Sequence, residues 1–166
     1  HILDGYARYN IRNNNAKAIY FDTKELTVKR VTIGEEENET EWEIGYPDQY
    51  KGMALKVSIT PTTQVVTIYY ETTPVGAAAV DWLAPEQTAD KKHPFLFTQG
   101  QAILTRTWIP CQDSPGIRIT YDATIRVPKD LMAVMSASNP QKKNDTGVYT
   151  FTMDQPVPPY LLALAV

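Results

Sequence analysis

The sequence is poor in the residues that bind soft metals or form disulfides. It has one cysteine, Cys111, and two histidines, His1 and His93, among 166 residues. A single cysteine cannot form an internal disulfide, which favours a reducing compartment, so we expect a cytoplasmic protein. A hydrolytic zinc site needs about three protein ligands and an open fourth position. Because neither histidine has a ligand partner at helical spacing, we expect no zinc site within the chain itself.

The chain also lacks long apolar runs and a large excess of charge of either sign. The longest apolar stretch, Tyr160 to Val166, is far shorter than a membrane span requires, so we expect no membrane insertion. The formal net charge is −3, and the basic residues are scattered. Without a basic field to attract phosphate groups, nucleic-acid binding is not expected. The chain opens His1-Ile2-Leu3-Asp4, which indicates a cut or processed end.

The motifs of self-contained catalysis are missing. The sequence has no Gly-x-Ser-x-Gly elbow, no phosphate-binding glycine loop and no dinucleotide fingerprint. A nucleophile pair of Cys111 and His93 lacks an orienting third group. Adjacent carboxylates such as Glu35 and Glu36 would point to opposite faces of a strand, so the acidic run is expected to be a solvated loop. We therefore expect no catalytic residue in the chain.

Alternation of apolar and polar residues predicts β-strands along most of the chain. In the clearest case, from Ile117 to Val127, every second residue is apolar. This pattern predicts a long strand with one buried face in an antiparallel sheet. Two more runs, Leu55 to Ile59 and Val66 to Tyr70, lie on either side of Pro61 and predict a hairpin.

Further strand candidates are bounded by breaks rich in Gly, Pro and Asn. They are Ala18 to Asp22, Leu26 to Ile33, Gln101 to Ile109, Leu131 to Ala137 and Val148 to Met153. A phase change within Leu26 to Ile33 predicts a β-bulge near Lys29 and Arg30. About nine strands and almost no helix are expected, because no window sustains helical spacing with capping signals at both ends. The sequence predicts a single all-β domain over residues 1–166, either a two-sheet sandwich or an open, saddle-like pair of mostly antiparallel sheets.

Aromatic residues offer an alternative function. A platform for a carbohydrate or peptide could be built from Trp42, Tyr46, Tyr50, Tyr69, Tyr70 and Trp82. Aromatics in β-rich chains more often lie in the core or pair across strands. Two segments that begin at Asn38 and Asn144 match the N-glycosylation pattern, although polar loops also produce this pattern by chance. The alternative is therefore a free-standing β-sandwich adhesion or carbohydrate-binding module.

A series of ordered motifs runs from Tyr70 to the end of the chain. The motifs are Tyr70-Glu71-Thr72-Thr73-Pro74, Trp82-Leu83-Ala84-Pro85-Glu86-Gln87-Thr88, His93-Pro94-Phe95-Leu96-Phe97-Thr98-Gln99-Gly100-Gln101-Ala102, Ile109-Pro110-Cys111-Gln112-Asp113-Ser114-Pro115, Val127-Pro128-Lys129-Asp130-Leu131 and Pro159-Tyr160-Leu161-Leu162-Ala163-Leu164. Together they resemble the N-terminal domain of the zinc aminopeptidases of the aminopeptidase N superfamily, and within it the branch that contains the bifunctional leukotriene hydrolase/aminopeptidase. Nearly the whole chain is covered, and Phe21 to Val28 matches more loosely.

The resemblance implies a saddle-shaped β domain that packs against a thermolysin-like catalytic domain of the same protein. It implies that the family's opening strands are missing before His1 and that the catalytic domain begins just after Val166. The zinc motif His-Glu-x-x-His and the Gly-x-Met-Glu-Asn segment belong to that catalytic domain. Zinc is thus the expected cofactor of the full-length enzyme, in which zinc-bound water attacks the first peptide bond of a short peptide.

The resemblance assigns substrate contact to Gln99, Gly100, Gln101 and Ala102, a segment that in the family reaches the cleft and contacts the N-terminal residue of the bound peptide. Gln101 is the first candidate, because a carboxamide both donates and accepts without placing a charge near the metal. Gly100 would let the backbone approach the ligand closely. From the residues alone, both glutamines could instead satisfy backbone groups at a strand start. The resemblance favours substrate contact.

The Pro-Cys-Gln-Asp stretch is interpreted as structural. Asp113 with Ser114, Pro115 and Gly116 predicts a turn, and Cys111 is expected to be buried. The leading hypothesis is therefore a cleft-shaping N-terminal domain of a zinc metallo-aminopeptidase that removes N-terminal residues from peptides. Alone, such a domain would not be catalytic.

Overall fold

The computed structural model describes residues 2–166 and consists of β-strands joined by turns and loops. These residues form thirteen strands and three short 3-10 turns, with no α-helix. The predicted all-β fold class is confirmed, although the strand count expected from the sequence was too low. No helix in this range is long and apolar enough to cross a membrane. The candidate ligand His1 lies outside the described residues.

The chain divides into two compact units, each described by itself. The first unit contains the residues up to Ala78 together with Thr105–Asp113. The second unit contains Ala79–Leu104 and Ser114–Val166. The single domain expected over residues 1–166 stays a prediction.

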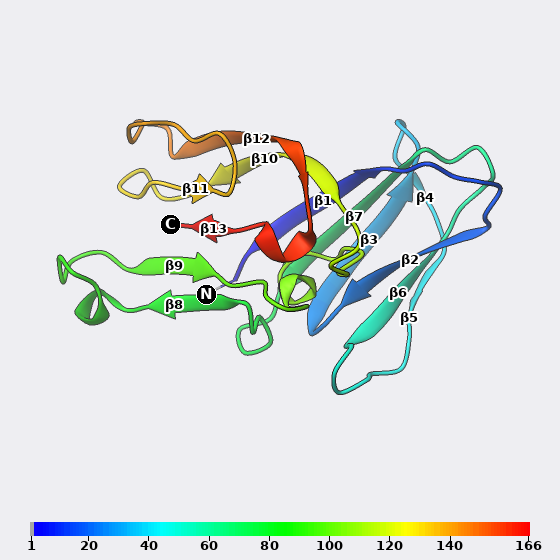
Figure 1. The fold of residues 1–166 in the computed structure, drawn as a ribbon, viewed down its shortest axis with the longest axis horizontal. Coiled ribbons are helices and arrows are strands. Elements are labelled where there is room, and N and C mark those ends of the chain that lie inside the picture. The colour runs from blue at the N-terminus through cyan, green and yellow to red at the C-terminus, as the bar shows by residue number, and fades with distance from the viewer. Residues whose placement is uncertain (1) are drawn as a thin grey trace. The chain divides into compact units, whose positions relative to one another are not determined.

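Seven strands form two antiparallel sheets in the first unit (Figure 1). The strands are β1 (Asp4–Asn10), β2 (Ala18–Thr23), β3 (Leu26–Ile33), β4 (Asn38–Glu39), β5 (Trp42–Ile44), β6 (Met53–Ser58) and β7 (Val65–Thr72). One sheet has the order β1-β7-β3-β4, and the other has the order β2-β6-β5. The 3-10 turn η2 (Thr105–Thr107) also belongs to this unit.

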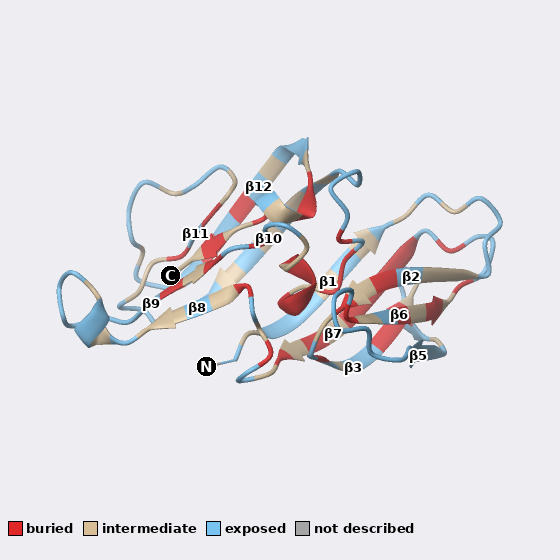
Figure 2. Ribbon diagram, turned by 60° about the horizontal axis from the view of Figure 1, so that its bottom comes forward, coloured by how far each residue is buried: buried red, intermediate tan, exposed pale blue. Residues whose placement is uncertain are grey.

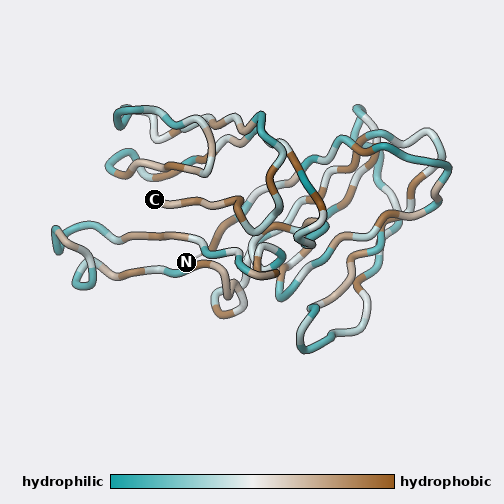
Figure 3. Tube along the Cα trace, viewed as in Figure 1, coloured by the Kyte–Doolittle hydropathy of each residue, from teal (hydrophilic) through white to brown (hydrophobic). Residues whose placement is uncertain are grey.

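A hydrophobic core joins the two sheets of the first unit. Its buried members are Phe21, Leu26, Val31, Leu55, Val57, Ile59, Val66, Ile68 and Tyr70. Figure 2 shows buried segments along β6 and β7, and Figure 3 shows that hydrophobic positions concentrate on strands while the connecting loops are mostly hydrophilic. Each large apolar side chain buried here stabilises the fold by roughly 1.5–3 kcal/mol relative to exposure.

The predicted hairpin of Leu55 to Ile59 with Val66 to Tyr70 is wrong. Strand β6 pairs with β2 and β5, whereas β7 pairs with β1 and β3. The two runs contribute to one core from different sheets, and a turn closed by Thr63 N–H donating to Thr60 O at 3.0 Å lies between them. Period-two alternation shows that one face of each strand is buried, but it does not specify the pairing partner.

The predicted bulge in β3 is confirmed. The register of β3 against β7 shifts between Val28 and Arg30, which leaves Lys29 outside the ladder. The Lys29 ammonium lies 2.6 Å from an Asp4 oxygen and 2.7 Å from a Glu71 oxygen. The extra residue therefore places its charge between two carboxylates on neighbouring strands.

The acidic run follows β3 and leads into β4 through a turn. Glu35 and Glu36 are exposed, as expected of a solvated loop. The Glu35 carboxylate nevertheless pairs with Arg8, and Tyr69 Oη donates to Glu37 Oε1 at 2.8 Å. The run is also tied to its sheet by an ion pair between Glu39 and Arg30, with Arg30 Nε 3.4 Å from Glu39 Oε1.

The second unit has two antiparallel sheets, one with the order β11-β13-β9-β8 and the other formed by β10 and β12. The strands are β8 (Val80–Leu83), β9 (Phe95–Thr98), β10 (Ile119–Arg126), β11 (Val134–Met135), β12 (Val148–Val157) and β13 (Leu164–Ala165). Two 3-10 turns, η1 (Pro85–Gln87) and η3 (Pro159–Leu161), connect them.

The long strand predicted from Ile117 to Val127 is observed as β10. Its residues alternate between half-buried and exposed, so its apolar face is covered less completely than expected. The partner strand β12 supplies the buried Tyr149 and Phe151, which are 1% and 2% exposed. The strand predicted from Leu131 to Ala137 shortens to the two residues of β11.

The strand predicted from Gln101 to Ile109 is wrong. The chain forms turns over residues 101–104 and then the 3-10 turn η2. The N–H groups of Trp108 and Ile109 donate to Thr105 O at 3.0 and 2.9 Å. Local turn hydrogen bonds thus replace the expected strand ladder.

We predict that Tyr70 limits stability at alkaline pH. Tyr70 is 9% exposed, and burial, with a smaller contribution from Cys111, raises the pKa of its hydroxyl. Because this pKa is higher in the folded state, its stabilisation is complete below about pH 10 and is lost as the pH rises further. Urea unfolding of Tyr70→Phe between pH 8 and 12 should show a weaker fall in stability, by up to about 1.4 kcal/mol per pH unit.

The control for this experiment is Tyr46→Phe, because Tyr46 is 99% exposed. It should leave the alkaline fall unchanged. Equal slopes for Tyr70→Phe and the unaltered protein would show that Tyr70 ionisation does not drive alkaline unfolding.

Candidate functional site

The Gln99–Ala102 segment follows β9 directly and belongs to the second unit. Strand β9 lies between β8 and β13, and Leu164 N–H donates to the Thr98 hydroxyl oxygen at 2.9 Å. Gln99 N–H then donates to Ala79 O at 2.7 Å. The start of the segment is therefore fixed to a paired strand.

The backbone within the segment is also held by hydrogen bonds. Gln101 N–H donates to the Gln99 side-chain oxygen Oε1 at 3.0 Å, and Leu104 N–H donates to Gly100 O at 2.8 Å. The peptide bond between Gln101 and Ala102 is cis. Gly100 is buried, whereas Gln99, Gln101 and Ala102 are exposed. The turn thus presents three side chains to solvent.

The two glutamines differ in what their side chains contact. The Gln99 carboxamide oxygen accepts a backbone hydrogen bond. The Gln101 carboxamide is exposed and has no hydrogen-bond partner among residues 2–166. The interpretation in which both glutamines serve backbone groups therefore holds only for Gln99. The substrate contact expected for the whole segment stays a prediction.

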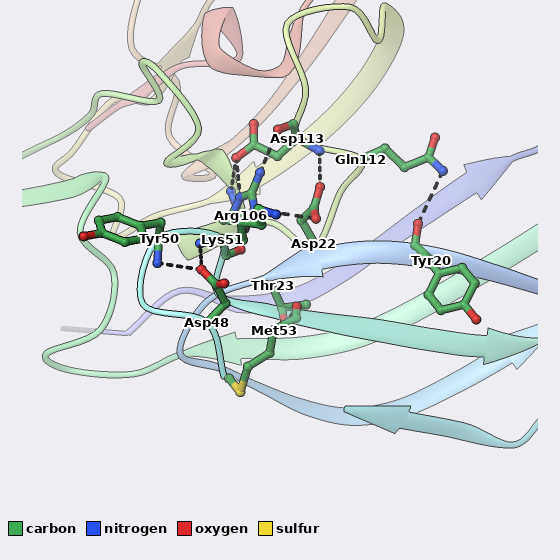
Figure 4. A network of polar contacts seen from close by, with 10 residues as sticks. All are labelled: Tyr20, Asp22, Thr23, Asp48, Tyr50, Lys51, Met53, Arg106, Gln112 and Asp113. Carbon is green, nitrogen blue, oxygen red and sulfur yellow. Dashed lines mark hydrogen bonds and ion pairs between the residues drawn. The ribbon is translucent and has the colours of Figure 1, made fainter. Parts of the chain in front are cut away.

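A buried arginine organises the Thr105–Asp113 segment of the first unit (Figure 4). Arg106 is 4% exposed, its Nε donates to Asp113 Oδ2 at 3.1 Å, and its Nη2 donates to Asp113 O at 2.7 Å. Nη1 donates to Lys51 O and lies 3.5 Å from Asp22 Oδ1. These partners match the planar fork of N–H donors of the guanidinium.

The same carboxylates fix the neighbouring backbone. Arg106 N–H donates to Asp113 Oδ2 at 3.1 Å, and Asp113 N–H donates to Asp22 Oδ2 at 2.9 Å. Asp22 and Cys111 exchange backbone hydrogen bonds of 2.7 and 3.2 Å, so the segment pairs with the edge of β2. This confirms that the Pro-Cys-Gln-Asp stretch is structural. The expected turn is also present, closed by Ile117 N–H donating to Ser114 O at 3.0 Å.

Cys111 is buried, as predicted, at 3% exposure. Burial raises the pKa of its thiol well above the ordinary value, and the Asp113 and Asp22 carboxylates add to the effect. A nucleophilic cysteine reacts as its thiolate and needs a lowered pKa and access. The environment of Cys111 has neither property, which argues against the hypothesis of a nucleophile pair with His93.

His93 lies in an exposed loop of the second unit, where its imidazole contacts the carboxylate of Asp90. Its Nδ1 is 2.6 Å from Asp90 Oδ2. This contact, followed by the N–H groups of Lys92 and His93, holds the pKa of Asp90 well below its ordinary value. No group of three or more His, Cys, Asp or Glu side chains in residues 2–166 is arranged to hold a metal ion. These residues therefore do not fit a zinc ion, which needs about three protein ligands.

The six candidate aromatics do not form one platform. Tyr70 lies in the core, and Tyr69 packs against Tyr6 with ring centroids 5.5 Å apart. Trp82 belongs to the second unit. Three of the six remain exposed around β5 and the loop after it, namely Trp42, Tyr46 and Tyr50.

The fold defines the class of protein, which is an all-β chain of antiparallel sheets with no metal-binding cluster in residues 2–166. The Peptidase M1 N-terminal domain family matches residues 1–161. The chain therefore belongs to the Peptidase M1 N-terminal domain family. The resemblance found in the sequence motifs is confirmed.

Curated relatives come from the branch that the motifs indicated. The chain is 37% identical to leukotriene A-4 hydrolase of Xenopus laevis over 158 residues, which cover 90% of this chain and 26% of that protein. It is 52% identical to aminopeptidase B of Rattus norvegicus over 87 residues, or 52% of this chain and 13% of that protein. The chain spans about a quarter of the hydrolase it matches.

Solved structures share the fold. The leukotriene A4 hydrolase of Saccharomyces cerevisiae superposes with a TM-score of 0.83 at 27% identity, over 99% of this chain and 26% of that one. An M1 zinc metallopeptidase of Deinococcus radiodurans superposes with a TM-score of 0.70 at 20% identity, over 99% of this chain and 37% of that one. At this identity, the second likeness shows the fold alone.

We predict that Asp113→Ala severely destabilises the protein. The substitution would leave the buried Arg106 guanidinium without its main counter-charge, and breaking one side of a buried pair costs about 3–5 kcal/mol. Chemical denaturation should show this loss as a lower midpoint. Asp145→Ala is a matched control, because Asp145 is exposed and forms no ion pair within residues 2–166, and it should change stability by less than about 0.5 kcal/mol. A small effect of Asp113→Ala would contradict a structural role for the pair.

Proposed function

We propose that this chain shapes the substrate cleft of a zinc aminopeptidase and that Gln101 contacts the N-terminal residue of a bound peptide. The chain is the N-terminal domain of an M1-type protein. The observation that carries the proposal is the exposed carboxamide of Gln101, which has no partner within residues 2–166 although its backbone is braced on both sides.

Several relatives have peptidase names. Besides aminopeptidase B, leucine aminopeptidase 2 of Yarrowia lipolytica is 35% identical over 98% of this chain and 25% of that protein. The yeast leukotriene A4 hydrolase has also been solved in complex with bestatin, with a TM-score of 0.84 and 28% identity over 99% of this chain and 25% of that one. The two aminopeptidase names support removal of N-terminal residues as the activity of the whole protein.

Zinc would have to be held outside this chain. The His93–Asp90 pair supplies one imidazole and one carboxylate, and Cys111 is buried with a raised pKa. We therefore assign zinc to a catalytic domain of the same protein and none to this chain. In this proposal, the chain binds and orients the peptide and takes no part in metal chemistry.

The chemistry of a glutamine suits the proposed contact. A carboxamide offers one acceptor oxygen and two N–H donors, so it can accept from a peptide ammonium group or donate to a carbonyl. It carries no charge that would compete with the substrate for the metal. Because the Gln101 side chain is not already bonded within residues 2–166, a ligand would not have to break an internal hydrogen bond.

A hollow in the first unit keeps the alternative function open. It has a volume of about 480 Å³ and is lined by Thr40, Glu41, Trp42, Glu43, Lys56 and Ser58. Trp42 is 37% exposed there, and Glu43 and Lys56 form an ion pair at 2.7 Å. An indole beside polar groups is a combination that also suits a sugar ring, so a carbohydrate-binding module is the second candidate.

Translation of the source transcript past Val166 discriminates between the two candidates. The proposal expects Gly-x-Met-Glu-Asn followed by His-Glu-x-x-His within the next few hundred residues. A stop codon or an unrelated domain would overturn the peptidase proposal for this protein. The hollow around Trp42 would then be the surface to screen with sugars.

We predict that Gln101→Ala impairs the aminopeptidase that contains this chain. Losing one or two hydrogen bonds to a charged or polar substrate group should lower kcat/KM about tenfold or more. The measurement is steady-state hydrolysis of a tripeptide and of amino-acid p-nitroanilides. Gln141→Ala is the control, because Gln141 is exposed and lies in another loop of the same unit. Equal kcat/KM for the two variants would refute the contact.

A further inference from the structure

Two glutamines that the sequence makes equivalent have different surroundings in the Gln99–Ala102 segment. Gln99 follows β9, and its side-chain oxygen accepts from Gln101 N–H at 3.0 Å. The Gln101 side chain is exposed and has no partner in residues 2–166. One glutamine therefore holds the backbone of the other.

Three hydrogen bonds brace the segment, and only one of them uses a side chain. Gln99 N–H donates to Ala79 O at 2.7 Å, and Leu104 N–H donates to Gly100 O at 2.8 Å. Both of these join backbone groups, so exchanging one side chain for another, proline excepted, does not remove the donor or the acceptor. The bond from Gln101 N–H to Gln99 Oε1 is the only one of the three whose acceptor can be removed by changing one side chain.

We propose that Gln99 is a positioning residue for peptide cleavage: it fixes the backbone from which the Gln101 carboxamide reaches the substrate, a role that rests on the function proposed above. Gln99 acts in this way through Gln101 rather than through its own contact with the peptide. The substrate group that Gln101 would contact is the polar N-terminal end of the peptide.

The physical basis is that the hydrogen bond from Gln101 N–H to Gln99 Oε1 orders the backbone before the peptide binds. An exposed glutamine has several rotatable bonds, and fixing a mobile side chain at an interface reduces affinity. A backbone already locked at Gln101 leaves only the side chain to be ordered when the peptide binds. Because a typical net hydrogen bond changes an equilibrium by roughly twofold to tenfold, loss of the bond should lower kcat/KM by about three- to tenfold.

Two substitutions of Gln99 separate positioning from direct contact. Gln99→Glu keeps an oxygen at the same reach, so it still accepts from Gln101 N–H. Gln99→Met has a similar length but lacks a carboxamide oxygen. If Gln99 contacted the peptide through its own N–H donors, Glu would lose those donors, add a charge and be at least as harmful as Met.

The first experiment measures kcat/KM for a tripeptide in the full-length enzyme. Positioning predicts a three- to tenfold loss in Gln99→Met and a value within about twofold of the unaltered enzyme in Gln99→Glu. It also predicts that adding Gln99→Met to Gln101→Ala causes little further loss, because both changes interrupt the same contact. A Glu variant as impaired as Met, or additive losses in the double variant, would overturn the positioning role.

Amide hydrogen exchange of the peptide that contains residues 99–104 provides a readout independent of activity. Gln101 N–H should exchange several-fold faster in Gln99→Met than in the unaltered enzyme and in Gln99→Glu. Unchanged exchange in Gln99→Met would show that the bond does not hold the segment, and this would overturn the inference. If Gln101→Ala has full activity, the proposed substrate contact fails, and the positioning role fails with it. If Gln101→Ala is impaired but Gln99→Glu matches Gln99→Met, only the positioning role fails.

Discussion

The buried ion pair of Arg106 and Asp113 is the constraint on which the irregular part of the first unit depends. The two side chains are 5% and 2% exposed, which removes both charges from water. The charges compensate each other, and neighbouring carbonyl and carboxylate oxygens accept the remaining guanidinium N–H groups. Charges removed from water in this way are tolerated only when nearly every donor finds an acceptor. The pair therefore fixes the path of Thr105–Asp113 without the continuous ladder of a strand.

The candidate site uses the opposite arrangement of polar groups. In the buried network the donors and acceptors are matched within the chain, whereas the Gln101 carboxamide is left unmatched in residues 2–166. An exposed carboxamide is hydrated and so is not destabilising in the free protein, and it can exchange water for a ligand. A binding residue needs a fixed backbone and a polar side chain that is not already hydrogen-bonded, and Gln101 has both within residues 2–166. Because the chain belongs to the Peptidase M1 N-terminal domain family, a peptide is the ligand that we propose for Gln101.

Local regularities of the sequence predicted about half of the strands. The phase change in β3 located the bulge between Val28 and Arg30, and the alternation in β10 located a long strand. Pairing was not predictable, because β6 and β7 have the same pattern but lie in different sheets of one sandwich. The 3-10 turn at Arg106 was missed because the contacts of the Arg106 side chain include the distant backbone of Lys51 and Asp22, which a local sequence pattern does not reveal.

The site was predicted in outline and not in detail. The family resemblance identified the Gln99–Ala102 segment, but the sequence could not show that one glutamine binds the backbone of the other. That difference arises from geometry after the end of β9, where Gln99 Oε1 faces Gln101 N–H. Spacing of two residues is compatible with such a bond and does not require it.

The most direct test of the account is a crystal structure of the full-length enzyme with a bound peptide analogue that has a free amino terminus. The account predicts a Gln101 carboxamide atom within about 2.7–3.2 Å of a polar atom of the N-terminal residue, with Gln101 N–H still bonded to Gln99 Oε1. A structure in which the N-terminal residue of the analogue is bound without Gln101, and in which the Gln101 side chain points into solvent, would contradict the account.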